Sequence, residues 1–225
     1  MGRLVRRVLA GAASEGAVSV DPPLHHMFAL VVGAGVLHGL ALGSLGFRPT
    51  AMLYGAIKLP ILLIAGTLLC LPNLWVVHAA LGLRAEFGET VRGIVGAQCV
   101  LALVAVSLAP VVVFTNLAGA TYPFALAANA SVFALAAWCA QRALRRRLAP
   151  LVQRAPRVRF VLITWFAIHA FVSTKVGWIL RPFVGDPALP IEFLRSERWS
   201  EDPFANLFWT VVGLAASAAR RLFGA

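Results

Sequence analysis

The chain has little charge for its length. Of its 225 residues only 13% are charged, whereas 60% are hydrophobic and the mean hydropathy is +0.83. A soluble domain covers its core with polar side chains, and about 25% of its residues are charged. The composition therefore excludes an ordinary soluble globular domain and predicts an integral membrane protein.

Acidic residues are scarcer than basic ones, with nine Asp and Glu against 20 Lys and Arg and a net charge of +11. Such an excess can indicate a nucleic-acid partner. Here the cations lie in short gaps between apolar segments, and the chain has neither a basic recognition helix nor an aromatic stacking module. We therefore expect no nucleic-acid partner, and we interpret the cations as residues that orient helices in a bilayer.

The sequence also lacks the patterns of metal sites and of intramembrane hydrolases. The three cysteines, Cys70, Cys99 and Cys139, lie inside apolar runs without a Cys-x-x-Cys spacing. The chain has no His-Glu-x-x-His, no Gly-x-Ser-x-Gly and no pair of aspartates within a span. These absences predict a non-enzymatic protein with no metal and no cofactor.

Long apolar runs are what the chain does contain. A helix needs about 20 apolar residues to cross the hydrocarbon of a bilayer, and only helices and closed barrels satisfy their own backbone there. The prediction is an all-α, polytopic transmembrane bundle of about six spans, at residues 27–47, 59–81, 93–116, 121–141, 158–180 and 204–222. The last run is the shortest, so a five-span bundle is the alternative.

Basic residues in the connections predict the orientation. Lys and Arg favour the cytoplasmic side, and most of the 20 cations share one side if both termini are cytoplasmic. Residues 1–26 then form a basic cytoplasmic segment, 142–157 a basic cytoplasmic loop and 181–203 an outer cap loop. Since Gly11 and Glu15 interrupt the first apolar stretch, we expect no cleaved signal peptide. The multi-pass protein is predicted to lie in a cell inner membrane.

Prolines punctuate the predicted spans. Residues 48–59 are bounded by Pro49 and Pro60, which predicts an interfacial or extended helical turn before the second span. Pro72 and Pro110 lie inside the second and third spans and predict kinks there.

Small residues on the first span predict close helix packing. Gly35, Gly39 and Gly43 recur every four residues and give one helix face a flat groove that a neighbouring backbone can approach. The predicted neighbour is another helix of the same bundle, and a homo-oligomer contact is the alternative.

Polar residues at mid-membrane depth predict a second kind of contact. An unpaired polar group is costly in hydrocarbon, so we expect His38, Asn129 and His169 to point inward and share a hydrogen-bonded layer. The layer is interpreted as helix packing, with a proton relay or a ligand site as the alternative.

The end of the fifth span has the composition of an interface anchor. The stem of Lys175 can lie along apolar surface, Trp178 favours the membrane boundary and Arg181 can bind lipid phosphate. Apolar residues in the following loop predict that it packs back on the bundle. A lipid or partner site is the alternative, and the basic loop 142–157 predicts attraction to anionic lipid headgroups.

Parts of the chain resemble uncharacterised bacterial polytopic proteins that are similar to the Yip1-domain superfamily. The resemblance lies in LYGAIKLPILLIAGTLLCLPNLWVVHAALGLR at 53–84, SLAP at 107–110, and GWILRPFVGDP at 177–187 with PIEF at 190–193. The resemblance implies a multispanning bundle and a bacterial origin, as does the ratio of 18 Arg to 2 Lys. Yip1-type proteins contact small GTPases through a cytosolic N-terminal region. Here only about 26 residues precede the first span, so the resemblance supplies the architecture and no binding residues.

The combined expectation is a non-enzymatic scaffold or assembly partner that organises lipids or other membrane proteins, with a protein partner or a homo-oligomer. One alternative is a small-solute or ion conduit, with His38, Asn129 and His169 along the path. The other is an enzyme acting on lipid headgroups through Asp186 and Glu192.

Overall fold

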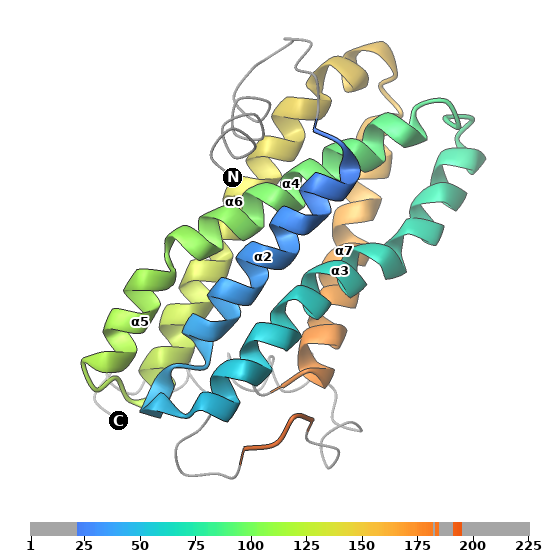
Figure 1. The fold of residues 1–225 in the computed structure, drawn as a ribbon. Helices are drawn as coiled ribbons and strands as arrows, with labels where there is room; N and C mark the ends of the chain where they lie inside the picture. Colours follow the sequence, from blue (N-terminus) through green and yellow to red (C-terminus); the bar gives the residue numbers. More distant parts are fainter. Residues whose placement is uncertain (1–21, 182, 185–190, 195–225) are drawn as a thin grey trace, which may run out of the picture.

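The computed structural model describes residues 22–181, 183–184 and 191–194. Every regular element in these ranges is helical, and no strand occurs among them. Figure 1 shows an elongated bundle whose helices run roughly side by side. In chain order they are α2 (Leu24–Leu42), the 3-10 helix η1 (Leu45–Phe47), α3 (Pro49–Ala80), α4 (Phe87–Ser107), α5 (Ala109–Leu117), α6 (Tyr122–Arg154) and α7 (Val158–Ile179).

Five helical segments are long and apolar enough to cross a membrane. They are Leu24–Leu42, Pro49–Ala80, Phe87–Leu117, Tyr122–Arg154 and Val158–Ile179. Because a spanning segment must satisfy its backbone internally, this all-helical architecture is that of an integral, multi-pass membrane protein. The predicted sixth span, 204–222, lies outside the described residues, as does most of the predicted outer cap loop.

The five spans alternate in direction, with α4 and α5 together forming the third, so the connections between spans gather at two ends. The α3–α4 and α6–α7 connections lie at one end, at the top of Figure 1. Arg84, Arg92, Arg154 and Arg157 lie there, so we name it the basic end. The opposite end carries the α2–α3 and α5–α6 connections and the C-terminus of α7.

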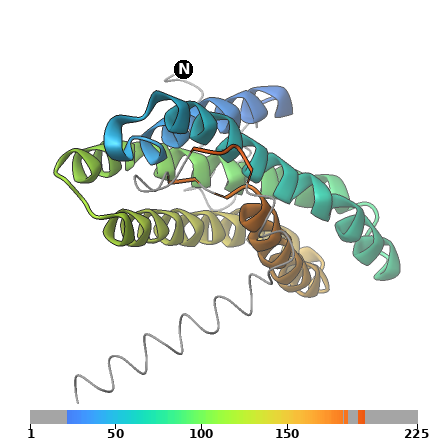
Figure 2. The same cartoon turned by 90° about the horizontal axis from the view of Figure 1, so that it is seen from below.

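The basic end is closely packed. Leu148 and Leu151 of α6 meet Val158, Val161 and Trp165 of α7, and all five side chains are at most 4% exposed. From this junction α6 and α7 diverge toward the opposite end of the bundle, as Figures 1 and 2 show. Their separation is therefore largest at the end of the bundle opposite the basic end.

The second predicted span has to be extended. Residues 48–59 were expected to be an interfacial or extended helical turn leading into this span. Arg48 caps α3 and the residues after it form its first turns, and Pro60 lies inside the helix together with Pro72. Membrane helices tolerate internal proline because neighbouring groups satisfy the freed carbonyls. Pro110 acts as expected, since the helix breaks at Leu108 and resumes as α5 with proline in its first turn.

The predicted basic loop 142–157 is also largely helical, because α6 continues to Arg154. Its arginines, leucines and alanines are strong helix formers. Leu144, Leu148 and Leu151 are buried at the spacing of one helix face, which holds this extension against the bundle. Only Ala155 to Arg157 connect α6 to α7.

Candidate functional site

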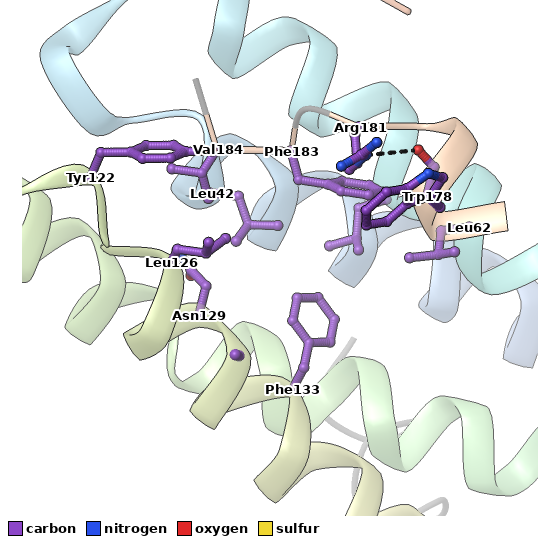
Figure 3. Close-up of a pocket in the computed structure, with 12 residues that line it drawn as sticks. Leu42, Leu62, Tyr122, Leu126, Asn129, Phe133, Trp178, Arg181, Phe183 and Val184 are labelled. Atoms are coloured by element: carbon purple, nitrogen blue, oxygen red, sulfur yellow. Dashed lines mark hydrogen bonds between the residues drawn. The ribbon is translucent and has the colours of Figure 1, made fainter. Parts of the chain in front are cut away.

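A cavity of about 490 Å³ lies where α6 and α7 diverge. Figure 3 shows side chains from α2, α3, α6 and α7 around it, together with three residues that follow α7. The lining consists of Leu42, Leu59, Leu62, Tyr122, Leu126, Asn129, Ala130, Phe133, Trp178, Arg181, Phe183 and Val184. Most of this surface is apolar, so the cavity suits hydrocarbon.

The chain beyond α7 closes one side of the cavity. Val184 is 4% exposed and packs with Leu42 and Ala125, and Phe183 packs against the same cluster. Phe193, further along, stacks edge-to-face on Tyr54 of α3, with ring centroids 5.1 Å apart. These described parts of the predicted cap loop therefore lie on the bundle, as the apolar residues of the loop indicated.

Asn129 and Trp178 bring polar atoms to this apolar lining. Asn129 is 4% exposed, and its Nδ2 donates to the carbonyl oxygen of Ala125 at 2.8 Å. Its Oδ1 and the Nε1 of Trp178 are buried without a hydrogen-bond partner among the described residues. Buried polar groups in proteins are nearly always paired, so these two atoms are exceptions among the described residues.

Arg181 brings a positive charge to the same place. Its guanidinium carbon lies 3.2 Å from the centroid of the Trp178 ring, and its Nε donates to the Trp178 carbonyl oxygen at 3.2 Å. Figure 3 shows this stack beside the cavity. Of the three predicted interface anchors, Trp178 and Arg181 line the cavity, whereas Lys175 lies on α7 outside the lining.

The predicted layer of His38, Asn129 and His169 divides into two places. His38 is fully buried and meets the ring of Phe133 edge-to-face at 5.4 Å, so it lies behind the cavity wall. Neither of its ring nitrogens has a hydrogen-bond partner among the described residues. His169 instead joins a separate polar cluster, because it lies on the face of α7 that packs toward α3 and α4.

That cluster links three helices. Gln98 of α4 donates through Nε2 to Thr67 of α3 at 3.0 Å and to Nε2 of His169 at 2.9 Å. Nδ1 of His169 then donates to the Ser173 hydroxyl at 3.0 Å. The sequence interpretation did not include Gln98 and Ser173. The available signals were an amide inside an apolar run and the four-residue spacing of His169 and Ser173.

The three predicted packing glycines lie where α2 crosses α3. A Cβ on Gly35 would lie 3.2 Å from Pro60, one on Gly43 would lie 2.5 Å from Met52, and one on Gly39 would overlap the carbonyl group of Gly55. The partner helix is therefore in the same chain. Gly55 of α3 is the reciprocal small residue, which sequence reasoning did not single out.

A buried lysine near this crossing was also missed. Lys58 of α3 is one of the two lysines in the chain, and it is fully buried. Its Nζ lies 5.0 Å from the Phe193 ring centroid and 5.9 Å from that of Tyr54, within the range of cation–π attraction. Lys58 thus helps to hold the 191–194 segment on α3.

The described lining of the cavity holds no carboxylate, histidine, cysteine or serine. Within residues 22–181, 183–184 and 191–194, no group of three His, Cys, Asp or Glu side chains is placed to hold a metal ion. Of the predicted headgroup-enzyme pair, Glu192 lies in the segment beyond α7 and Asp186 lies outside the described residues. The arrangement can bind and orient an amphiphile. Comparisons of the chain with protein-family models, with curated proteins and with solved structures find no match.

Proposed function

We propose that the protein is a non-enzymatic membrane component that organises lipids by holding the hydrocarbon chain of a lipid in the cavity between α6 and α7. The observation that carries the proposal is the cavity itself, about 490 Å³ of mainly apolar space among spanning helices. Its volume lies within the range of about 300–1,000 Å³ usual for ligand pockets. A lipid chain is the apolar ligand at highest concentration around these helices.

The surroundings of the cavity support the same function. Trp178 and Arg181 are residue types that favour the boundary between hydrocarbon and headgroups. A lipid held there would have its chain between α6 and α7 and its headgroup beside the cation. A bacterial inner membrane, with the basic end cytoplasmic, is the setting that the sequence resemblance and the arginines favour.

Filling the cavity tests this function. Ala130 lines the cavity, whereas Ala127, three residues earlier on α6, does not, and both are exposed. Protein purified in a mild non-ionic detergent should retain lipid, measured by mass spectrometry of the extract. Ala130→Phe should lower the lipid retained per protein, and Ala127→Phe should not. Equal retention in the unmodified chain and both variants would show that the cavity holds no lipid.

A small-solute or ion conduit is the second candidate function, and the cluster of Thr67, Gln98, His169 and Ser173 favours it. Polar groups from three helices meet there at mid-membrane depth, and Oε1 of Gln98 is buried without a partner among the described residues. Flux into liposomes that His169→Ala abolishes would support the conduit. Lipid retention without flux would favour the lipid-organising function.

A further inference from the structure

We infer that Phe133 limits the length of the hydrocarbon chain in this cavity, so that a lipid chain of about 13–16 carbons fits best. The inference rests on the proposed function and adds a chain-length preference and the residue that imposes it. It follows from the order of the lining residues on α6, from the packing beyond Phe133 and from the size of the cavity.

The lining residues of α6 give the cavity a direction and a length. Tyr122, Leu126, Asn129, Ala130 and Phe133 all line it and lie on one face of the helix. Figure 3 shows Tyr122 at one end of this row and Phe133 at the other. Because an α-helix rises about 1.5 Å per residue, the row is about 16 Å long. The hydrocarbon of a bilayer is about 30 Å thick, so the cavity has the depth of about one leaflet.

The headgroup end of the cavity is the end at Tyr122. Tyr122 is the first residue of α6, and Trp178 lies in the last turn of α7, so both are at the end of the bundle opposite the basic end. Both side chains line the cavity, and tyrosine and tryptophan favour the boundary between hydrocarbon and headgroups. A lipid chain that enters at this boundary extends along α6 toward Phe133.

Phe133 closes the other end. It is the last of the described lining residues on α6 toward the basic end. The next residues on that face of the helix, Ala136 and Ala140, are 0% and 5% exposed, so α6 is packed there. The ring of Phe133 meets the fully buried His38 edge-to-face, with centroids 5.4 Å apart. A chain longer than the row must therefore bend or displace a supported aromatic ring.

Two estimates of size agree on the length of chain that fits. An extended hydrocarbon advances about 1.25 Å per carbon, because bonds of about 1.5 Å form a zigzag, so about 16 Å accommodates about 13 carbons. A methylene group is similar in size to a water molecule, which occupies about 30 Å³ in the liquid. A cavity of about 490 Å³ therefore holds about 16 such groups. Shorter chains leave part of the cavity empty.

The test offers the full-length protein, in a mild non-ionic detergent, an equimolar mixture of saturated lysophosphatidylcholines. Their chains run from about 10 to 20 carbons and so bracket the expected length. The headgroup is identical throughout, so only the chain differs. Native mass spectrometry then gives the bound lipids relative to the mixture. Binding should be strongest at about 13–16 carbons, and the longest chain should bind about fivefold or more weakly, because overfilling a packed site is costly.

Variants assign the preference to Phe133. Phe133→Ala removes a ring about as long as three methylene steps, so the preferred chain should lengthen by about three carbons. Phe133→Trp should shift the preference toward shorter chains. The control is Phe124→Ala, the same substitution on the same helix, because Phe124 is 57% exposed and is not part of the lining. This control should leave the preferred length unchanged.

A flat distribution, or one that rises steadily to the longest chain, would overturn the chain-length limit. A preferred length that neither Phe133→Ala nor Phe133→Trp moves would overturn the role of Phe133. Both results leave the proposed function standing, because lipid still binds. If no member of the series binds, the inference and the proposed function both fail. The distribution on the unmodified protein decides the chain-length limit even where a variant does not fold.

Discussion

The crossing of α2 and α3 permits a graded test of close backbone packing. A Cβ on Gly39 would overlap the carbonyl group of Gly55 and lie 2.8 Å from the Cα of Ala56, so a backbone, which cannot rotate away, must move. Gly33 is on the same helix, and a Cβ there would meet nothing within 4 Å. Gly39 and Gly33 both lie inside α2 and differ in whether an added methyl group would contact α3, so they form a matched pair.

The magnitude follows from two opposed effects. Replacing glycine by alanine inside a helix raises helix stability by about 1 kcal/mol, and this gain is common to Gly39→Ala and Gly33→Ala. Inserting a methyl group into a closely packed contact costs about 1–3 kcal/mol. We therefore expect Gly39→Ala to be about 1–3 kcal/mol less stable than Gly33→Ala. Gly35→Ala should fall between them, because its Cβ would lie 3.2 Å from Pro60.

The assay is the free energy of unfolding in mixed micelles as the mole fraction of a denaturing detergent rises. Each variant is compared at several protein concentrations, since a contact within one chain gives a concentration-independent loss. If Gly39→Ala and Gly33→Ala unfold together, the close approach of α2 and α3 does not contribute to stability. A loss that depends on protein concentration would instead place these glycines at a contact between copies of the chain.

Three further predictions concern the rest of the bundle. Trp165 is 4% exposed in the core at the basic end, so Trp165→Ala should lower the free energy of unfolding by about 3 kcal/mol. The control Phe166→Ala changes a side chain that is 52% exposed and should lower it much less. Equal losses in the two variants would contradict the packing described. Glu89→Gln removes an ion pair with Arg154. The two side chains are 48% and 66% exposed, so thermal unfolding should show a loss of stability below about 1 kcal/mol. A loss of stability above about 2 kcal/mol would contradict the argument from exposure. Gln98→Leu removes two hydrogen bonds between helices and should cost about 0.6–1.7 kcal/mol in the same assay; an unchanged unfolding free energy would show that these bonds do not hold the helices together.

Much of the architecture follows from the sequence because the physical rule is local. A run of about 20 apolar residues must be helical in hydrocarbon, so the fifth predicted span, 158–180, matches α7 within a residue. The predicted span boundaries are wrong where a helix continues beyond the end of its apolar run. Pro60 and the arginines after Gln141 marked ends of hydrophobicity, yet α3 and α6 continue through them, since a helix needs its backbone hydrogen bonds more than it needs apolar side chains.

The candidate site was only partly accessible to the same reasoning. Trp178 and Arg181 could be selected because their chemistry suits a membrane boundary whatever their neighbours. Depth along a helix places His38, Asn129 and His169 at similar levels but does not give the rotation of each helix about its axis. That rotation put His38 behind Phe133, Asn129 in the cavity wall and His169 against Gln98.

The sequence by itself determined that the chain forms membrane-spanning helices and which side chains are polar within them, because both depend on composition over one or two helical turns. The tertiary structure alone decided that α6 and α7 diverge, that Phe183 and Val184 fold back, and that a cavity lies between them with Asn129, Trp178 and Arg181 in its wall. A cavity is a property of how separate helices fit together, and no segment of the chain encodes it alone.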